Sequence, residues 1–374
     1  MTGPQTHRIW VDADGAVWLE DPDEALTPLA LALAPDFGWH EPAPLSLGCR
    51  FQALRAWPVP RPWPASLPGL WQLHDEALHA LQAGAVLPAS RPDQPSLLDL
   101  KRAIALQLLE ACVLCEHRCG VNRVAGERGR CGVGAQSRHA PTFVHLGEER
   151  EIAPTLCVPF TGCSWHCVYC HTAELINRVD TGPTLDVEGH AAIFAAASQP
   201  GVRSLSFVGG NPDHHLAAVL DQLGHAPPGF ERAVVWNSNM YGSPELYRLL
   251  AGVVDVYLGD WRYGNDACAS RLSGIDGCWD AVARNWELVT RQGALCIARV
   301  LILPGHHACC TRPILTHLSQ AHPGILVSLL DQYHPAYRAG RAAPELARVP
   351  TAEEVALARA EAEALGLRLV LPHG

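Results

Sequence analysis

The sequence is almost without lysine: Lys101 is the only one, and the other cationic side chains are arginines. A lysine Schiff-base mechanism would have to use Lys101, which lies in a polar stretch that we expect to be exposed, so we discount that chemistry. Clusters of Lys and Arg are also absent, and the formal charge is −10. This charge balance argues against a nucleic-acid partner and is typical of a well-solvated acidic surface.

Long apolar runs are missing as well. No stretch approaches the roughly 18 residues of a membrane span, so we expect no membrane partner. Residues 1–10 contain no basic region followed by an apolar run, which predicts no signal peptide and a cytoplasmic location. The chain does have 14 cysteines. Because disulfides are disfavoured in the reducing cytosol, clustered cysteines there more often bind metal or do redox chemistry.

The 374 residues divide into three regions by composition. Residues 1–105 form an N-terminal region of unknown role, with a predicted hairpin turn at Asp14-Gly15. Residues 106–150 form a Cys-rich, metal-binding segment. Residues 151–374 alternate between strands and helices and end in a C-terminal helix. Since 48% of the residues are apolar, the chain can bury a sizeable core.

The third region predicts an α/β fold. Short apolar runs predict strands at Leu156–Phe160, Ser204–Val208, Ala233–Trp236, Val253–Leu258, Ala294–Leu303 and Gly324–Leu330. Helices are predicted between them at Val187–Ser198, His215–Leu223, Pro244–Leu250, Ile275–Arg291 and Arg312–Ala321. Strand–helix units of about 30 residues imply parallel pairing, so six units make an open doubly wound sheet or a partial barrel. In both folds, ligands lie at the carboxyl ends of the strands.

The strongest chemical signal follows the first predicted strand. Three cysteines are spaced by three and then two residues, in the run Cys163-Ser-Trp-His-Cys167-Val-Tyr-Cys170. A loop this short can turn three thiolates onto one [4Fe–4S] cluster, which leaves one of the four irons open to another ligand. Zinc and three buried cysteines without metal remain alternatives, although zinc sites usually use paired ligands with a second pair elsewhere.

Residues 162–171, the cluster loop, resemble the corresponding loop of the radical S-adenosylmethionine superfamily. The Tyr-Cys-His ending is similar to that of the pyruvate formate-lyase activating enzymes, and residues 112–338 resemble uncharacterised relatives of those enzymes. The resemblance implies a partial (β/α)6 TIM-like barrel with an N-terminal extension and a Cys-rich segment. It also implies that the three loop cysteines are catalytic and hold a [4Fe–4S] cluster. Such a cluster reductively cleaves S-adenosylmethionine to a 5′-deoxyadenosyl radical.

The same resemblance implies residues that bind S-adenosylmethionine. Gly209-Gly210-Asn211 ends the second strand, where the family receives the amino group of this cofactor, usually with an acidic residue in place of Asn211. Arg299 lies inside an apolar strand, and either a cofactor carboxylate or a local one such as Asp260 would balance its charge. The implied cofactor-binding residues are Tyr169, Gly209, Gly210, Asn211, Asn237, Ser238, Asp260 and Arg299.

A second set of cysteines, the quartet, precedes the cluster loop: Cys112, Cys115, Cys119 and Cys131. Four thiolates can close a structural zinc site or a second iron–sulfur cluster, and their irregular spacing leaves both open. The position is a departure, because activating enzymes with extra clusters generally carry the added cysteines after the catalytic triplet.

Two other cysteine-containing features carry less weight. We expect Cys268 to be an isolated packing residue. The run His306-His307-x-Cys309-Cys310 follows a predicted strand on the ligand-binding side. We interpret it as a loop with incidental His and Cys, with metal ligation or hydrogen-atom donation as the alternatives.

Three functions follow from these features. The first is a radical enzyme that activates a glycyl-radical enzyme, which would then be its protein partner. The second is radical modification of a peptide or small molecule with help from an auxiliary cluster at the quartet. The third is a non-enzymatic iron–sulfur or zinc protein. A radical enzyme would need an electron donor such as flavodoxin or ferredoxin.

Overall fold

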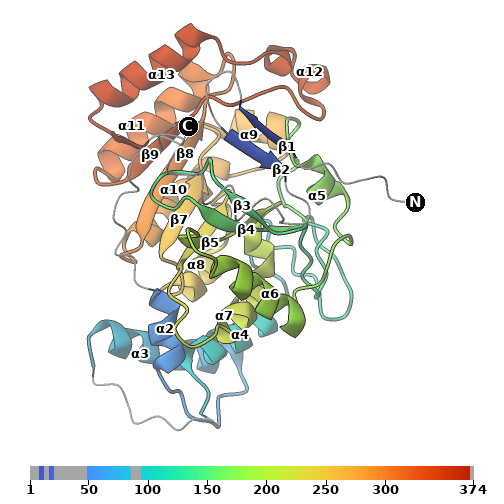
Figure 1. Cartoon of the computed structure of the whole chain (residues 1–374), viewed down its shortest axis with the longest axis vertical. Coiled ribbons are helices and arrows are strands. Elements are labelled where there is room, and N and C mark those ends of the chain that lie inside the picture. Colours follow the sequence, from blue (N-terminus) through green and yellow to red (C-terminus); the bar gives the residue numbers. More distant parts are fainter. Residues whose placement is uncertain (1–7, 12–16, 21–48, 86–93, 371–374) are drawn as a thin grey trace.

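The computed structural model describes residues 8–11, 17–20, 49–85 and 94–370. An eight-stranded sheet forms its centre, in the order β10-β9-β8-β7-β6-β5-β4-β3 (Figure 1). Neighbouring strands are parallel except β3, which runs antiparallel to β4. The bounds are β3 Phe143–His145, β4 Thr155–Phe160, β5 Ser204–Gly209, β6 Ala233–Ser238, β7 Val256–Asp260, β8 Leu295–Leu301, β9 Leu326–Leu330 and β10 Arg368–Val370.

This strand order decides between the two predicted architectures. In a doubly wound sheet the strand order reverses at a switch point, whereas in a barrel consecutive strands are neighbours throughout. Here β4 to β9 follow one another in chain order and the sheet stays open. The α/β fold class is therefore confirmed as a partial barrel, with the N-terminal extension and the Cys-rich segment added to it.

The strands are apolar because both faces of the parallel sheet are covered. Every residue of β4 and of β6 is buried. One face belongs to the main core between the sheet and its helices. The other face contributes to a small separate core, made of Ile152, Val235, Val256, Leu258, Ile297, Leu326 and Val370. We call this second face the inner face.

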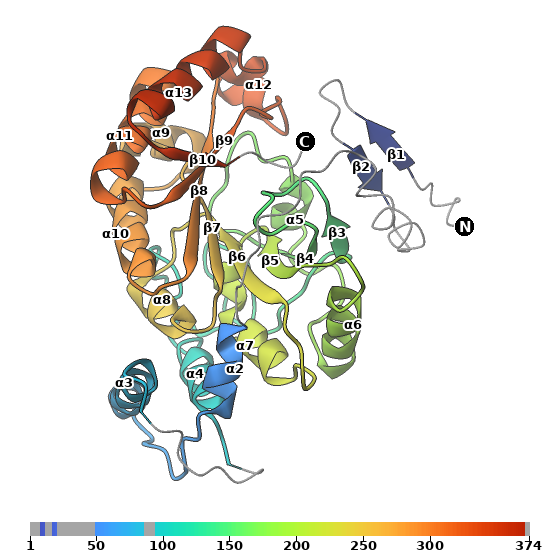
Figure 2. The same ribbon diagram turned by 60° about the vertical axis from the view of Figure 1, so that its left-hand side comes forward.

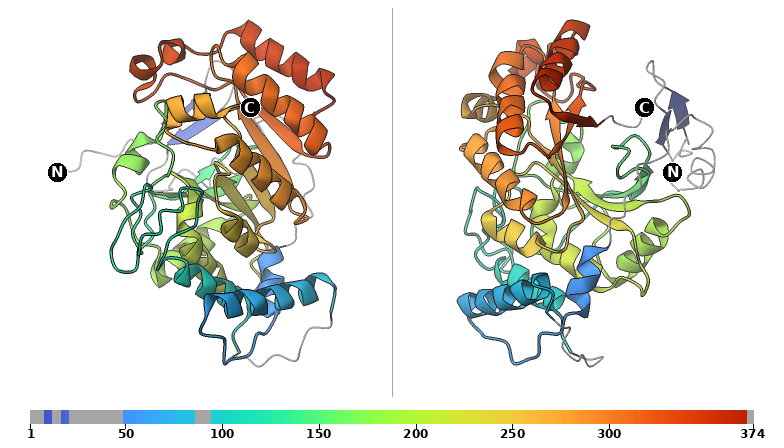
Figure 3. Two further views of the ribbon diagram at one scale, coloured as in Figure 1. Left: turned by 180° about the vertical axis from the view of Figure 1, so that it is seen from behind. Right: turned by 90° about the vertical axis from the view of Figure 1, so that its left-hand side faces the viewer.

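Helices between the strands cover the outer face of the sheet (Figures 2 and 3). They are α6 Val187–Ala197, α7 Leu216–Gly224, α8 Pro244–Leu250, α10 Cys278–Thr290 and α11 Arg312–Ala321, followed by α13 Ala352–Ala364. Local signals explain their starts. The Ser243 side chain accepts from the N–H of Leu246 at the start of α8, and Thr351 and Glu354 form the capping box of α13.

Several short elements were not predicted. They are α2 Arg50–Ala56, α5 Ala173–Asn177, α9 Asp266–Ser273, α12 Ala339–Ala342, the short helical turns η2 Pro212–His215, η3 His307–Thr311 and η4 Pro344–Ala347, and strands β3 and β10. Helix α9 had a readable signal, because Asn265 caps its start and Gly274 ends it with φ +65°. This omission matters, because α9 carries two residues of the sites described below.

The N-terminal region packs its helices against the outer side of the barrel. Helices α3 (Leu67–Gln82) and α4 (Leu97–Gln107) contact each other, and α4 also contacts α7. Strands β1 (Arg8–Val11) and β2 (Val17–Glu20) pair antiparallel, as a hairpin requires, while the predicted turn at Asp14-Gly15 lies outside the described residues. In the described part of the chain, no helix has the length and apolar character to cross a membrane.

The expectation that Lys101 is exposed was wrong. Its side chain is 0% exposed, and Nζ lies 2.8 Å from Nε2 of His74 and 3.1 Å from the carbonyl oxygen of Leu249. The ammonium group therefore satisfies a carbonyl at the end of α8, which otherwise has no intrahelical partner. The polar neighbours of Lys101 in sequence concealed a residue that faces inward on its helix.

Candidate functional site

The cluster loop leaves the sheet at the carboxyl end of β4 and is held from two sides. Gly162 has φ +79°, and a Cβ there would lie 2.3 Å from a methyl group of Val133 in the Cys-rich segment. On the other side, the N–H of Val168 donates to the carbonyl of Leu272 in α9 (2.8 Å). The backbone of the loop is thus shaped by neighbours that lie far from it in sequence.

Hydrogen-bond donors surround the sulfur atoms of the loop. The hydroxyl of Ser273 lies 2.9 Å from Sγ of Cys167, and a guanidinium nitrogen of Arg262 lies 3.8 Å from the same sulfur. The side-chain amide of Asn239 lies 3.9 Å from Sγ of Cys163. Burial raises the pKa of both thiols, and at Cys167 the positive charge of Arg262 opposes that rise. Donors placed in this way stabilise negative charge on iron-bound sulfur.

The spacing of the three sulfur atoms of the cluster loop distinguishes a site for a cluster from a site for a single ion. Among the residues that the structure describes, two groups of side chains bring three or more ligand atoms within 4.8 Å of one another. Neither group contains Cys163, Cys167 or Cys170. One zinc ion needs its ligands that close, whereas a cubane binds each thiolate through a different iron. The three thiols therefore fit a [4Fe–4S] cluster better than a zinc ion.

Tyr169 takes part in a chain of hydroxyl groups that leads to Cys167. Its hydroxyl lies 2.6 Å from that of Tyr263, which in turn lies 2.5 Å from the hydroxyl of Ser273. Each hydroxyl has one proton, and a thiolate only accepts. With Cys167 ionised, Ser273 donates to the sulfur, Tyr263 donates to Ser273 and Tyr169 donates to Tyr263. Sequence reasoning did not find Ser273, because α9 was not predicted.

Gly209 and Gly210 approach the backbone of the β4 end and the cluster loop. A Cβ on Gly210 would lie 2.2 Å from the carbonyl oxygen of Gly162, and a Cβ on Gly209 would lie 2.3 Å from the nitrogen of Phe160. The next residue, Asn211, is buried and donates to Oδ1 of Asn239 (3.2 Å). Within the described chain its own Oδ1 has no hydrogen-bond partner, so this oxygen can accept from a ligand.

An acidic residue does lie near Asn211, although sequence reasoning did not single it out. Asp213 is fully buried in η2 and accepts from the indole N–H of Trp236 (2.9 Å). Burial raises the pKa of Asp213 to about 6, while hydrogen bonds from Trp236, Asn211 and Ser238 oppose the rise. The carboxyl group of Asp213 thus lies next to Asn211, which occupies the position that is usually acidic in the family that the cluster loop resembles.

The two residues that end β6 face opposite sides of the sheet. Alternation along the strand places Asn237 on the inner face with Val235. Ser238 points to the other face, where its hydroxyl accepts from the N–H of Met240 (3.2 Å). The structure therefore does not bring Asn237 and Ser238 together, and only Asn237 shares the inner face with Asp260 and Arg299.

The charged residues of the inner face are paired within the chain. Asp260, at the end of β7, forms an ion pair with Arg262 (2.5 Å). Arg299 binds both carboxylate oxygens of Glu149 at 2.7 Å and also pairs with Glu148. The partner expected for Arg299 was a cofactor carboxylate or Asp260. The two glutamates come instead from the loop between β3 and β4, a loop for which the sequence predicted no structure.

The quartet lies against the cluster loop. In the Cys-rich segment, Nε2 of His117 and Nε of Arg130 each lie 3.2 Å from the carbonyl oxygen of Ser164. Burial raises the pKa of the Cys115 and Cys131 thiols, and other quartet thiols near each of them add to the rise. No three of the quartet sulfurs form one of the close ligand groups found among the described residues.

Comparison with protein families agrees with this chemistry. Residues 155–264 match a family described as a 4Fe-4S single cluster domain. The match begins at β4, contains the whole cluster loop and ends just after β7. The partial barrel, the three thiols at its carboxyl edge, of which Cys163 and Cys167 are buried, and this match together define an iron–sulfur protein.

The chain is also similar to an uncharacterized protein of Methanocaldococcus jannaschii, MJ0674. The two are 35% identical over 310 residues, which cover 80% of this chain and 89% of the archaeal protein. The chain belongs to the same family as that protein. Among solved structures, a crystal structure of HydG, a maturase of the [FeFe]-hydrogenase, matches with 13% identity and a TM-score of 0.40. That alignment covers 82% of this chain and 68% of HydG, and a likeness this distant decides nothing about activity.

Proposed function

We propose that this protein is an enzyme that reductively cleaves S-adenosylmethionine. The observation that carries the proposal is the set of three thiols on one short loop at the carboxyl edge of a partial barrel. Cys163 and Cys167 are buried, and amide, hydroxyl and guanidinium donors point at their sulfur atoms. When bound, a reduced [4Fe–4S] cluster supplies the electron that breaks a sulfur–carbon bond of S-adenosylmethionine and releases the 5′-deoxyadenosyl radical.

The surrounding residues support binding of that cofactor. The unpartnered Oδ1 of Asn211 can accept from an amino group, with Asp213 behind it adding negative character. Asn237 and Asp260 lie at the carboxyl ends of neighbouring strands on the inner face. Arg299 already has two carboxylates, so we assign it the role of holding the β3–β4 loop against the inner face. An arginine that is already paired with carboxylates is far less available to a cofactor carboxylate than an unpaired arginine.

The target of the radical is the finer part of the proposal. The quartet packs against the cluster loop, which favours an auxiliary iron–sulfur cluster and modification of a peptide or small molecule. Activation of a glycyl-radical enzyme is the second candidate, motivated by the Tyr-Cys-His ending of the cluster loop. Either reaction requires a low-potential electron donor, for which flavodoxin or ferredoxin is the proposed partner, in a cytoplasmic setting.

Anaerobic reconstitution of the full chain tests the proposal. Iron and sulfide would be counted, the EPR spectrum of the reduced protein recorded with and without S-adenosylmethionine, and 5′-deoxyadenosine assayed. We expect about eight irons per chain, a spectrum that S-adenosylmethionine alters, and 5′-deoxyadenosine formation.

The matched variants are Cys163→Ala and Cys157→Ala, both at buried cysteines in or next to β4. Cys163→Ala should abolish both the response to S-adenosylmethionine and product formation, whereas Cys157→Ala should retain both. A loaded cluster in the unaltered protein that ignores S-adenosylmethionine would leave an electron carrier as the better account.

A further inference from the structure

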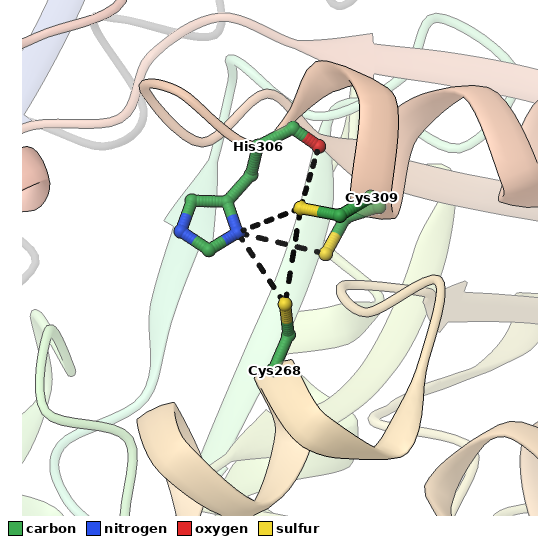
Figure 4. A group of neighbouring side chains, drawn as sticks. Cys268, His306 and Cys309 are labelled. Atoms are coloured by element: carbon green, nitrogen blue, oxygen red, sulfur yellow. Dashed lines mark hydrogen bonds between the residues drawn. The ribbon is translucent and has the colours of Figure 1, made fainter.

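Side chains from two segments that are separated in sequence meet beside the cluster loop. Cys268 lies in α9, while His306, Cys309 and Cys310 lie in and next to η3, the turn that follows β8. Their ligand atoms all lie within 4.8 Å of one another, with the sulfur atoms gathered around one imidazole nitrogen (Figure 4). The expectation that Cys268 is an isolated packing residue was wrong.

The distances match those of a single tetrahedral metal ion. Zn–S bonds of about 2.3 Å and Zn–N bonds of about 2.0 Å place tetrahedral ligands about 3.8 Å (S to S) and about 3.5 Å (S to N) apart. In the structure, Sγ of Cys268 lies 3.8 Å from Sγ of Cys309. The imidazole Nδ1 of His306 lies 3.6 Å from Sγ of Cys268, 3.4 Å from that of Cys309 and 3.7 Å from that of Cys310. A cubane needs wider spacing, so these ligands suit one ion.

The backbone around this group is built to bring the two segments together. A Cβ on Gly264 would lie 2.6 Å from the carbonyl oxygen of Cys309, so only glycine permits this approach. Asn265 caps α9 by accepting from the N–H of Cys268 (2.9 Å) and donates its amide to the carbonyl of Cys309 (2.7 Å). Helix η3 is a single π-helical turn, a form that is often found at functional sites.

A carboxylate also orients the histidine. Nε2 of His306 lies 3.4 Å from a carboxylate oxygen of Glu345 and 3.3 Å from the guanidinium group of Arg271, and these two side chains pair with each other at 2.6 Å. Histidines that bind metal through one nitrogen commonly donate the other N–H to a carboxylate, which sets the tautomer. With the Nε2 proton donated to Glu345, Nδ1, the nitrogen that faces the three sulfurs, is left to coordinate.

We propose that Cys268, His306, Cys309 and Cys310 bind one zinc ion. Three thiolates and one imidazole form a closed tetrahedral site, which is the form of structural zinc. The ion ties the segment after β7 to the turn after β8. The first of these segments carries Arg262 and Tyr263, so zinc fixes the loop that supplies donors to the cluster loop. The site stands independently of S-adenosylmethionine cleavage.

The test measures metal content and coordination in the full chain, purified anaerobically with zinc and iron in the medium. We expect one zinc per chain by mass spectrometry, with three sulfur and one nitrogen ligands in zinc X-ray absorption. The double variant Cys268→Ser/Cys309→Ser should lose that zinc. Cys278→Ser, at a buried cysteine outside the group, should keep it. His306→Cys should also keep the zinc ion, now with four sulfur ligands. This change of ligand in a folded variant would show that His306 coordinates the ion.

Further variants separate this site from the other cysteines. Cys163→Ala should lose iron and keep zinc, and a quartet variant, Cys112→Ser/Cys119→Ser, should keep zinc as well. Zinc retained in Cys268→Ser/Cys309→Ser, or absence of zinc from the folded protein, would overturn the proposal. A disulfide between Cys268 and Cys309 in the anaerobic protein would do the same and would point to a redox pair.

Discussion

Removing the hydroxyl of Ser273 should lower the reduction potential of the cluster that we propose on the cluster loop. This hydroxyl lies 2.9 Å from Sγ of Cys167, and Tyr263 at 2.5 Å supplies its own proton to Ser273. The Ser273 proton is therefore committed to the sulfur. Reduction adds negative charge to the cluster and its thiolates, so a donor to sulfur stabilises the reduced state more than the oxidised one.

The size of the shift follows from the strength of one such bond. A hydrogen bond to a charged group contributes about 1.5–3 kcal/mol. The added electron spreads over the whole cluster, so we take about 1 kcal/mol as the difference between the two oxidation states. About 1.4 kcal/mol corresponds to 59 mV for a one-electron couple. Ser273→Ala should thus move the midpoint potential about 40 mV in the negative direction.

The assay is an EPR-monitored redox titration of the reconstituted protein. Ser270→Ala is the matched control, because Ser270 lies on the same helix and is exposed. It should leave the potential unchanged, and Tyr263→Phe should shift it in the same direction as Ser273→Ala by a smaller amount. An unchanged or more positive potential in Ser273→Ala, at full iron content, would refute the donor direction that we derive.

Two further predictions concern the scaffold. Gly210→Ala should reduce iron incorporation several-fold, because its Cβ would lie 2.2 Å from the backbone of the cluster loop; Gly224→Ala, where a Cβ meets nothing within 4 Å, should not. Lys101→Met should lower the free energy of unfolding by about 1–3 kcal/mol by leaving carbonyls at the end of α8 unsatisfied, whereas Arg102→Met should cost under about 0.5 kcal/mol. Burial lowers the pKa of Lys101 to about 7. Between about pH 7 and 10, the unfolded chain therefore holds a proton on Lys101 that the folded chain has lost. The free energy of unfolding of the unaltered protein should then rise relative to that of Lys101→Met over this range. Thermal melts at pH 7 and 9 check this, and a constant or shrinking difference would contradict it.

Much of the barrel was predictable because its signals are local. Helices α8 and α11 were predicted with their observed bounds, since Pro lies in the first turn of each and Ser243 also caps the start of α8. The six parallel strands of β4 to β9 were found from apolar runs, because both faces of such strands are buried. The cluster loop was equally readable, since its three cysteines lie within eight residues.

What the sequence alone determined, then, is the set of strand–helix units and the one metal loop whose ligands are neighbours along the chain. The tertiary structure decided every feature that joins distant residues. Glu149 and Arg299 are 150 residues apart, and Cys268 is 38 residues from His306. Lys101 looks exposed from its neighbours and is buried by helices far away in sequence. A periodic pattern reports which face of an element is apolar, but not which other element that face meets, so these pairings follow only from the packed fold.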